Sequence, residues 1–92
     1  MSTFVIDLAD GAGSLERLLN KCRRKGHIPR SFAVGPSVDG VMRVLVDFHE
    51  PAAAPERIAA DLAKVYDVRA IEHRTDPRLA TALDAAIAAS NP

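Results

Sequence analysis

Residues 3–22, TFVIDLADGAGSLERLLNKC, change their apolar period partway along, and this change decides the fold. In residues 3–9 apolar and polar side chains alternate, a period of two that predicts a half-buried strand. From residue 14 to residue 25 the apolar side chains are spaced three and four apart, which predicts an amphipathic helix. Between them, residues 10–15 (DGAGSL) supply two glycines and a serine. The stretch therefore predicts a strand, a glycine turn and a helix.

Four further elements follow along the chain. Residues 30–35 and 41–48 alternate again, and the turn-forming PSVDG between them predicts a hairpin. Pro55 suits a first helical position, and the apolar spacing that follows predicts a second helix. In the last strand, residues 66–73, the inward Val68 and Ile71 have an odd spacing that predicts a bulge or a shift of face.

The order strand, helix, strand, strand, helix, strand predicts an α+β fold. We expect a ferredoxin-like βαββαβ domain over residues 1–74, with two helices on one face of a four-stranded antiparallel sheet. Residues 75–92 are predicted to form a C-terminal helical tail. Its start is marked by Asp76 and Pro77, and its apolar side chains fall four apart.

Composition excludes several classes of protein. The 92 residues carry twelve basic and twelve acidic side chains, a balance that argues against nucleic acid or an anionic membrane as the partner. Apolar runs fall short of the ~20 residues that cross a bilayer, and the first residues lack the basic start of a signal peptide. A cytoplasmic location is expected. The single Cys22 permits no internal disulfide and is expected to be buried as a small apolar residue.

Catalytic and metal-binding patterns are absent from the sequence. His27, His49 and His73 lack metal-ligand spacing and are expected at the surface or at strand ends. Scattered acids such as Asp7 and Asp47 are expected to be solvated. We therefore expect no catalytic residue, no metal site and no cofactor on this chain.

The glycine turn leaves two interpretations open. Glu16 stands where the GxGxxG dinucleotide fingerprint needs its third glycine, and no Gly-Lys-Ser/Thr follows, so a nucleotide cradle is excluded. A tight structural turn remains. So does a helix N-terminus whose backbone N–H groups suit a carboxylate.

Several short motifs recur in the order and spacing of a known family. They are Gly13-Ser14-Leu15, Gly26-His27, Gly35-Pro36 and Lys64-Val65-Tyr66-Asp67-Val68. Over residues 3–73 they resemble an ACT domain. More narrowly, the chain is similar to the short, single-module small (regulatory) subunit of acetolactate synthase, also called acetohydroxyacid synthase.

This resemblance implies a non-catalytic regulatory subunit in branched-chain amino acid biosynthesis. It implies a homodimer joined through the second strands, which activates the catalytic subunit; thiamine diphosphate, FAD and magnesium would sit on that partner. The edge strand of the dimer would comprise Arg30, Ser31, Phe32, Ala33, Val34 and Gly35. A branched-chain amino acid effector would bind between two sets of residues from different copies: Asp10, Gly11, Ala12, Gly13, Ser14 and Leu15 on one, Ile28 and Pro29 on the other. The alternatives are a free-standing ACT amino-acid sensor acting on another protein, and a purely structural dimerisation module.

Overall fold

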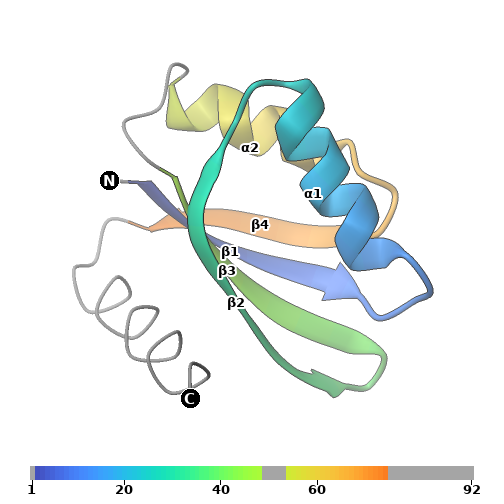
Figure 1. Ribbon diagram of the computed structural model, residues 1–92. Helices are drawn as coiled ribbons and strands as arrows, with labels where there is room; N and C mark the ends of the chain where they lie inside the picture. Colours follow the sequence, from blue (N-terminus) through green and yellow to red (C-terminus); the bar gives the residue numbers. More distant parts are fainter. Residues whose placement is uncertain (1, 49–53, 75–92) are drawn as a thin grey trace, which may run out of the picture.

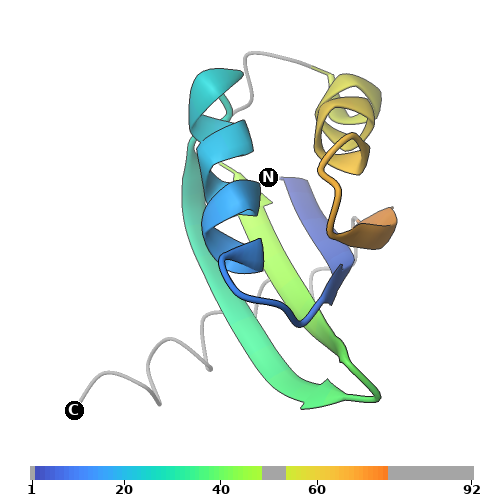
Figure 2. The same ribbon diagram turned by 90° about the vertical axis from the view of Figure 1, so that its right-hand side faces the viewer.

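A computed structural model describes residues 2–48 and 54–74 and has the predicted βαββαβ order. The four strands form one antiparallel sheet in the order β2-β3-β1-β4, and both helices lie on the same face of it (Figures 1 and 2). The elements are β1 (Ser2–Ala9), α1 (Ser14–Arg24), β2 (Pro29–Val38), β3 (Val41–Phe48), α2 (Pro55–Ala63) and β4 (Val68–Arg74). The α+β ferredoxin-like fold is confirmed. The predicted tail helix, residues 75–92, lies outside the described residues, and the domain boundary before it stays a prediction.

The core lies between the sheet and the two helices. Alternate side chains of β1 and β3 enter it, as their period of two predicts, and α1 and α2 each add one apolar stripe. Its fully buried members include Phe4, Ile6, Leu8, Val44, Val46, Phe48, Leu18, Cys22, Ile58 and Leu62. The prediction that Cys22 is a buried small residue is confirmed. Burial away from water raises the pKa of its thiol to about 11.

The β2–β3 hairpin is longer than the sequence predicted. Strand β2 continues past Gly35 and Pro36 to Val38, and the turn itself is Asp39-Gly40, with φ angles of 53° and 77°. Positive φ at both central residues is the requirement of a two-residue type I′ hairpin turn. The proline is accommodated because β2 is an edge strand, where an N–H is dispensable.

Strand β4 contains the irregularity that its apolar spacing predicted. Asp7 of β1 pairs with Ala70 and the next residue, Leu8, pairs with Val68, so Arg69 is an extra residue in β4. A bulge of this kind moves the following side chains to the other face. Val68 and Ile71 consequently both pack against the core.

One acid predicted to be solvated is fully buried. Asp47 of β3 has no exposed surface, although it belongs to the sheet face opposite the helices. Its Oδ2 atom accepts a hydrogen bond of 2.7 Å from Arg30 Nε on β2. The prediction was wrong because a strand sequence does not show which cation the neighbouring strand places beside an acid.

Candidate functional site

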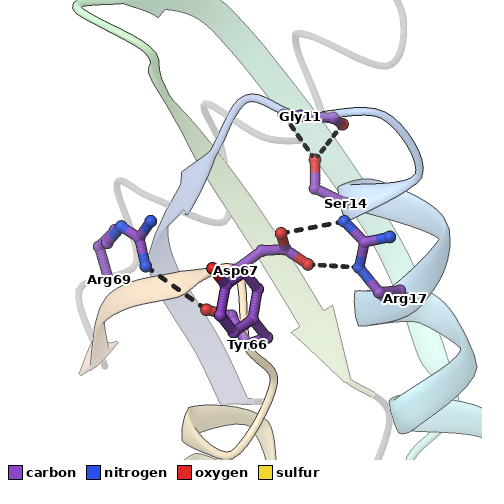
Figure 3. Close-up of polar contacts among 6 residues, drawn as sticks. All are labelled: Gly11, Ser14, Arg17, Tyr66, Asp67 and Arg69. Atoms are coloured by element: carbon purple, nitrogen blue, oxygen red, sulfur yellow. Dashed lines mark hydrogen bonds and ion pairs between the residues drawn. The ribbon is translucent and has the colours of Figure 1, made fainter.

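The glycine turn between β1 and α1 closes on itself. Gly13 has a φ of +75°, a left-handed conformation that favours glycine. The Ser14 hydroxyl donates to the Gly11 carbonyl at 2.9 Å and accepts from the Gly11 N–H at 3.3 Å (Figure 3). The Ser14 N–H also donates to the Gly11 carbonyl, at 3.1 Å. Two of the N–H groups expected to face an anion are therefore engaged inside the turn.

Two acidic side chains lie around this turn, and the one cation beside it, Arg17, is paired with Asp67. Glu16 lies in the first turn of α1 and satisfies the positive end of the helix dipole. Asp10 is exposed directly before the turn. A carboxylate ligand would meet two like charges here, so the geometry favours the tight structural turn among the two interpretations. Of the other predicted effector residues, Ala12 is exposed and Leu15 packs against the core. Effector binding by this loop stays a prediction.

An ion pair fixes α1 to the segment between α2 and β4. Arg17 Nε donates to Asp67 Oδ2 at 2.6 Å, and Arg17 Nη2 donates to Asp67 Oδ1 at 3.0 Å (Figure 3). Such a two-point contact fixes direction as well as distance. The Arg17 guanidinium lowers the pKa of the Asp67 carboxyl below its ordinary value. Nothing in the sequence singled out this pair, whose members lie fifty residues apart.

The second half of the predicted effector site lies at the other end of α1. Ile28 is 72% exposed, and Pro29 begins β2. Because α1 has eleven residues at ~1.5 Å each, its ends are roughly 16 Å apart. Residues 10–15 and Ile28 of one chain therefore do not meet, and a site using both needs the loop of a second copy.

Beside Ile28 the surface is hollowed. The hollow has a volume of about 650 Å³ and is lined by Leu19, Arg23, His27, Ile28, Pro29, Arg30, Ser31 and Phe32. Side chains of α1 and of β2 thus enclose an apolar space flanked by two arginines.

His27 was predicted at the surface or at a strand end; it is buried at this hollow, two residues before β2 begins. Its Nε2 lies 2.9 Å from Asp61 Oδ2 of α2, and its ring packs edge-on against Phe48. The contact with His27 lowers the pKa of the Asp61 carboxyl. His73 is half-buried against Phe4, and His49 lies outside the described residues.

Strand β2, predicted to be the dimer edge, lies at one end of the sheet. Phe32 and Val34 occupy the same sheet face as the core, yet they are 36% and 41% exposed. Ser31 and Ala33, on the opposite face, are half-buried. The edge position is as predicted, and the pairing of this edge with a second copy stays a prediction.

Within residues 2–48 and 54–74, no group of histidine, cysteine and acidic side chains is placed to hold a metal ion. Over the same residues, neither helix has the length and apolar character that would let it span a bilayer.

Sheet order and helix placement define the class as a small α+β domain of ferredoxin-like arrangement. Several solved structures are similar to it, among them the following two. The C-terminal domain of the MgtC protein from Mycobacterium tuberculosis superposes with a TM-score of 0.60 at 15% identity, covering 79% of this chain and 83% of that chain. A formyltetrahydrofolate deformylase from Pseudomonas putida KT2440 superposes with a TM-score of 0.62 at 12% identity, covering 82% of this chain and 28% of the deformylase. At these identities the likeness shows the fold alone. No family model and no curated protein matches the sequence.

Proposed function

We propose that this chain is a small, non-catalytic regulatory domain of the ACT type that works as a homodimer joined through β2. One observation carries the proposal. Among the described residues, four of the five large apolar side chains that are exposed lie on β2 or directly before it: Ile28, Phe32, Val34 and Val38. Exposed apolar side chains gathered on one edge strand mark a surface that another chain covers.

Pairing of two β2 strands would also assemble the composite effector site. It would bring the 10–15 loop of one copy toward Ile28 and Pro29 of the other, which one chain cannot do. The apolar hollow beside Ile28 suits an aliphatic side chain, and Arg23 at its rim suits a carboxylate. These features favour a branched-chain amino acid as the effector.

The finer proposal is that the target is the catalytic subunit of acetolactate synthase, in the cytoplasm. Its support is the order of the four sequence motifs, and the cofactors of the reaction would belong to that subunit. Activation would require the dimer to bind the active state of the synthase more tightly than the inactive state. The alternative is a free-standing sensor that reports an amino acid to a different protein.

Sedimentation equilibrium of the full chain tests the dimer. The double variant Phe32→Lys with Val34→Lys is expected to raise the dimer dissociation constant at least about 100-fold, because two apolar side chains lose their cover and two charges repel. The matched control is Tyr66→Lys, since Tyr66 is the fifth exposed apolar side chain and lies outside β2. A wild-type chain that stays monomeric at working concentrations would refute the proposal.

Two further measurements separate the candidate targets. Adding the dimer to an acetolactate synthase catalytic subunit is expected to raise its turnover, and the β2 double variant is expected not to. Unchanged turnover together with calorimetric binding of valine, leucine or isoleucine would favour the free-standing sensor instead. If the dimer neither activates the synthase nor binds these amino acids, the remaining alternative is the structural dimerisation module.

A further inference from the structure

We propose that a second surface, the groove between α1 and the segment after α2, is a docking site for an acidic segment of a partner protein. The groove has a volume of about 570 Å³. It is defined here by Lys21, Arg23 and Arg24 of α1 with Lys64 and Tyr66 across from them. It contains neither β2 nor the glycine turn, and it shares only Arg23 with the hollow beside Ile28.

The charge of this groove is of one sign. Its charged lining consists of five cations and no acid, in a chain whose net charge is zero. Arg17, the fifth, is neutralised by Asp67. Among the described residues Lys21, Arg24 and Lys64 form no ion pair, and Arg23 contacts only the amide oxygen of Asn20, at 3.0 Å.

Helix dipoles account for only part of this charge. Basic residues in a last turn offset the negative end of a helix, which amounts to about half a unit charge. If the C-terminal ends of both helices are included, their dipoles contribute about one negative unit charge in total, compared with the four positive charges of the unpaired cations. The surplus is available to a partner that brings several negative charges.

Tyr66 gives the groove an aromatic wall. Its side chain is 83% exposed, although its neighbours Val65 and Asp67 are buried. The turn that carries it is fixed on both sides: Val68 N–H donates to the Val65 carbonyl at 3.0 Å, and Ala9 N–H donates to the Asp67 carbonyl at 2.8 Å. The Arg17 contact holds the Asp67 side chain (Figure 3). An exposed aromatic ring on an ordered turn loses little entropy on binding, and tyrosine and arginine are enriched at interface hot spots.

Acidic protein fits this surface better than other anions. A compact phosphate site uses backbone N–H groups at a helix N-terminus, whereas the groove lies along the C-terminal part of α1. Single-stranded nucleic acid needs several stacking aromatics, and Tyr66 is the only one here. Long, separated lysine and arginine side chains instead match carboxylates spaced along an extended peptide.

Fluorescence anisotropy of the full chain with a labelled peptide of alternating glutamate and serine tests this proposal. We expect binding that weakens with added salt, and at least about tenfold weaker binding when glutamine replaces glutamate. Lys64→Glu is expected to lower the affinity about tenfold. The matched control Arg57→Glu, an equal charge change on the exposed surface of α2 outside the groove, is expected to change it less than about twofold. Tyr66→Ser, which changes no charge, is expected to lower it about fivefold.

Several results would overturn the docking site. They are no peptide binding at low salt, equal losses in Lys64→Glu and Arg57→Glu, or unchanged affinity in Tyr66→Ser. Displacement of the peptide by a DNA oligonucleotide or by phosphatidylserine vesicles at lower concentration than by unlabelled peptide would assign the groove to nucleic acid or membrane instead. Sedimentation of the same variants keeps the two proposals apart, because losing this groove leaves the β2 dimer intact.

Discussion

The two edge strands of the sheet, β4 and β2, differ in how they are protected from pairing with another chain. At β4, Arg69, Glu72 and Arg74 present charge to solvent, Arg74 and Glu72 pair at 2.8 Å, and α2 packs alongside. At β2, the apolar side chains of Phe32 and Val34 are partly exposed. Charged side chains and a covering helix are two of the ways in which proteins prevent edge strands from pairing with other chains. Charged side chains and a helix both protect β4, whereas the exposed apolar side chains of β2 leave that strand available to pair with another chain.

The edges also differ in how they are attached. The segment leading into β4 is joined to α1 through Arg17 and Asp67. Strand β2 pairs only with β3 in the sheet, and the Arg30–Asp47 ion pair joins the same two strands on the face away from the helices. An ion pair at a fully buried carboxylate has a larger structural role than one at the surface.

The largest expected effect is from breaking that buried pair. Asp47→Ala is expected to lower the free energy of unfolding by about 2–3 kcal/mol, because it leaves a partly buried guanidinium without this carboxylate. At the β4 edge, Glu72→Ala breaks an exposed pair and is expected to cost less than about 1 kcal/mol. Urea unfolding of both variants measures the difference. Equal losses would show that the two edges are held alike.

A lysine placed on each edge tests the comparison directly. Val34→Lys in β2 is expected to raise the dimer dissociation constant about tenfold, since one apolar side chain loses its cover. Ala70→Lys in β4, also at an exposed position, is expected to leave it unchanged. Sedimentation at several concentrations measures both. If Ala70→Lys weakens the dimer as much as Val34→Lys, pairing does not use β2.

The sequence predicted those parts of the fold that depend on local patterns. The spacing of the apolar residues predicted every described strand and helix, and the odd spacing of Val68 and Ile71 predicted the bulge. Both follow from which side chains of a single element are buried, and this pattern can be read from the sequence of that element alone. The end of β2 was misplaced, since Pro36 signals a turn anywhere except on an edge strand.

The sequence could not show contacts between distant segments. Nothing in the sequence marks Asp47 or Asp67 as paired. Only the folded chain brings Arg30 to Asp47 and Arg17 to Asp67. His27 was misplaced for the same reason, since its partner Asp61 belongs to α2. The cationic groove likewise forms only when Lys64 and Tyr66 come to lie across from α1.

Substitution in the glycine turn, which lies beside the Arg17–Asp67 pair, is expected to have a smaller effect on stability. Gly13→Ala is expected to cost about 1–2 kcal/mol, because φ is +75° and a Cβ there would stand 3.1 Å from Arg17 Nη1. Gly11→Ala is the matched control: nothing lies within 4 Å of a Cβ at that position. Its free energy of unfolding is expected to change by less than about 0.5 kcal/mol. Thermal unfolding distinguishes the two, and equal losses would mean that the turn needs both glycines.

The smallest effect is expected from Asp67→Asn, because water screens the half-exposed Arg17. The folded-state pKa of Asp67 lies below its ordinary value, so the charged carboxyl stabilises the fold above about pH 5. This contribution is lost as the pH falls through the lowered pKa. Asp61 also has a lowered pKa, so both proteins lose stability in acid, and only the difference between them reports on Asp67.

Urea midpoints of wild type and Asp67→Asn should therefore converge as the solution is acidified. Asp10→Asn, at an exposed acid of the same loop region, should track wild type at every pH. A difference between Asp67→Asn and wild type that stays constant into strong acid would mean that the carboxyl acts by packing rather than by charge. The segment leading into β4 would then be held to α1 by packing and not by charge. Of the two ion pairs compared, only the buried Arg30–Asp47 pair would stabilise the fold through charge.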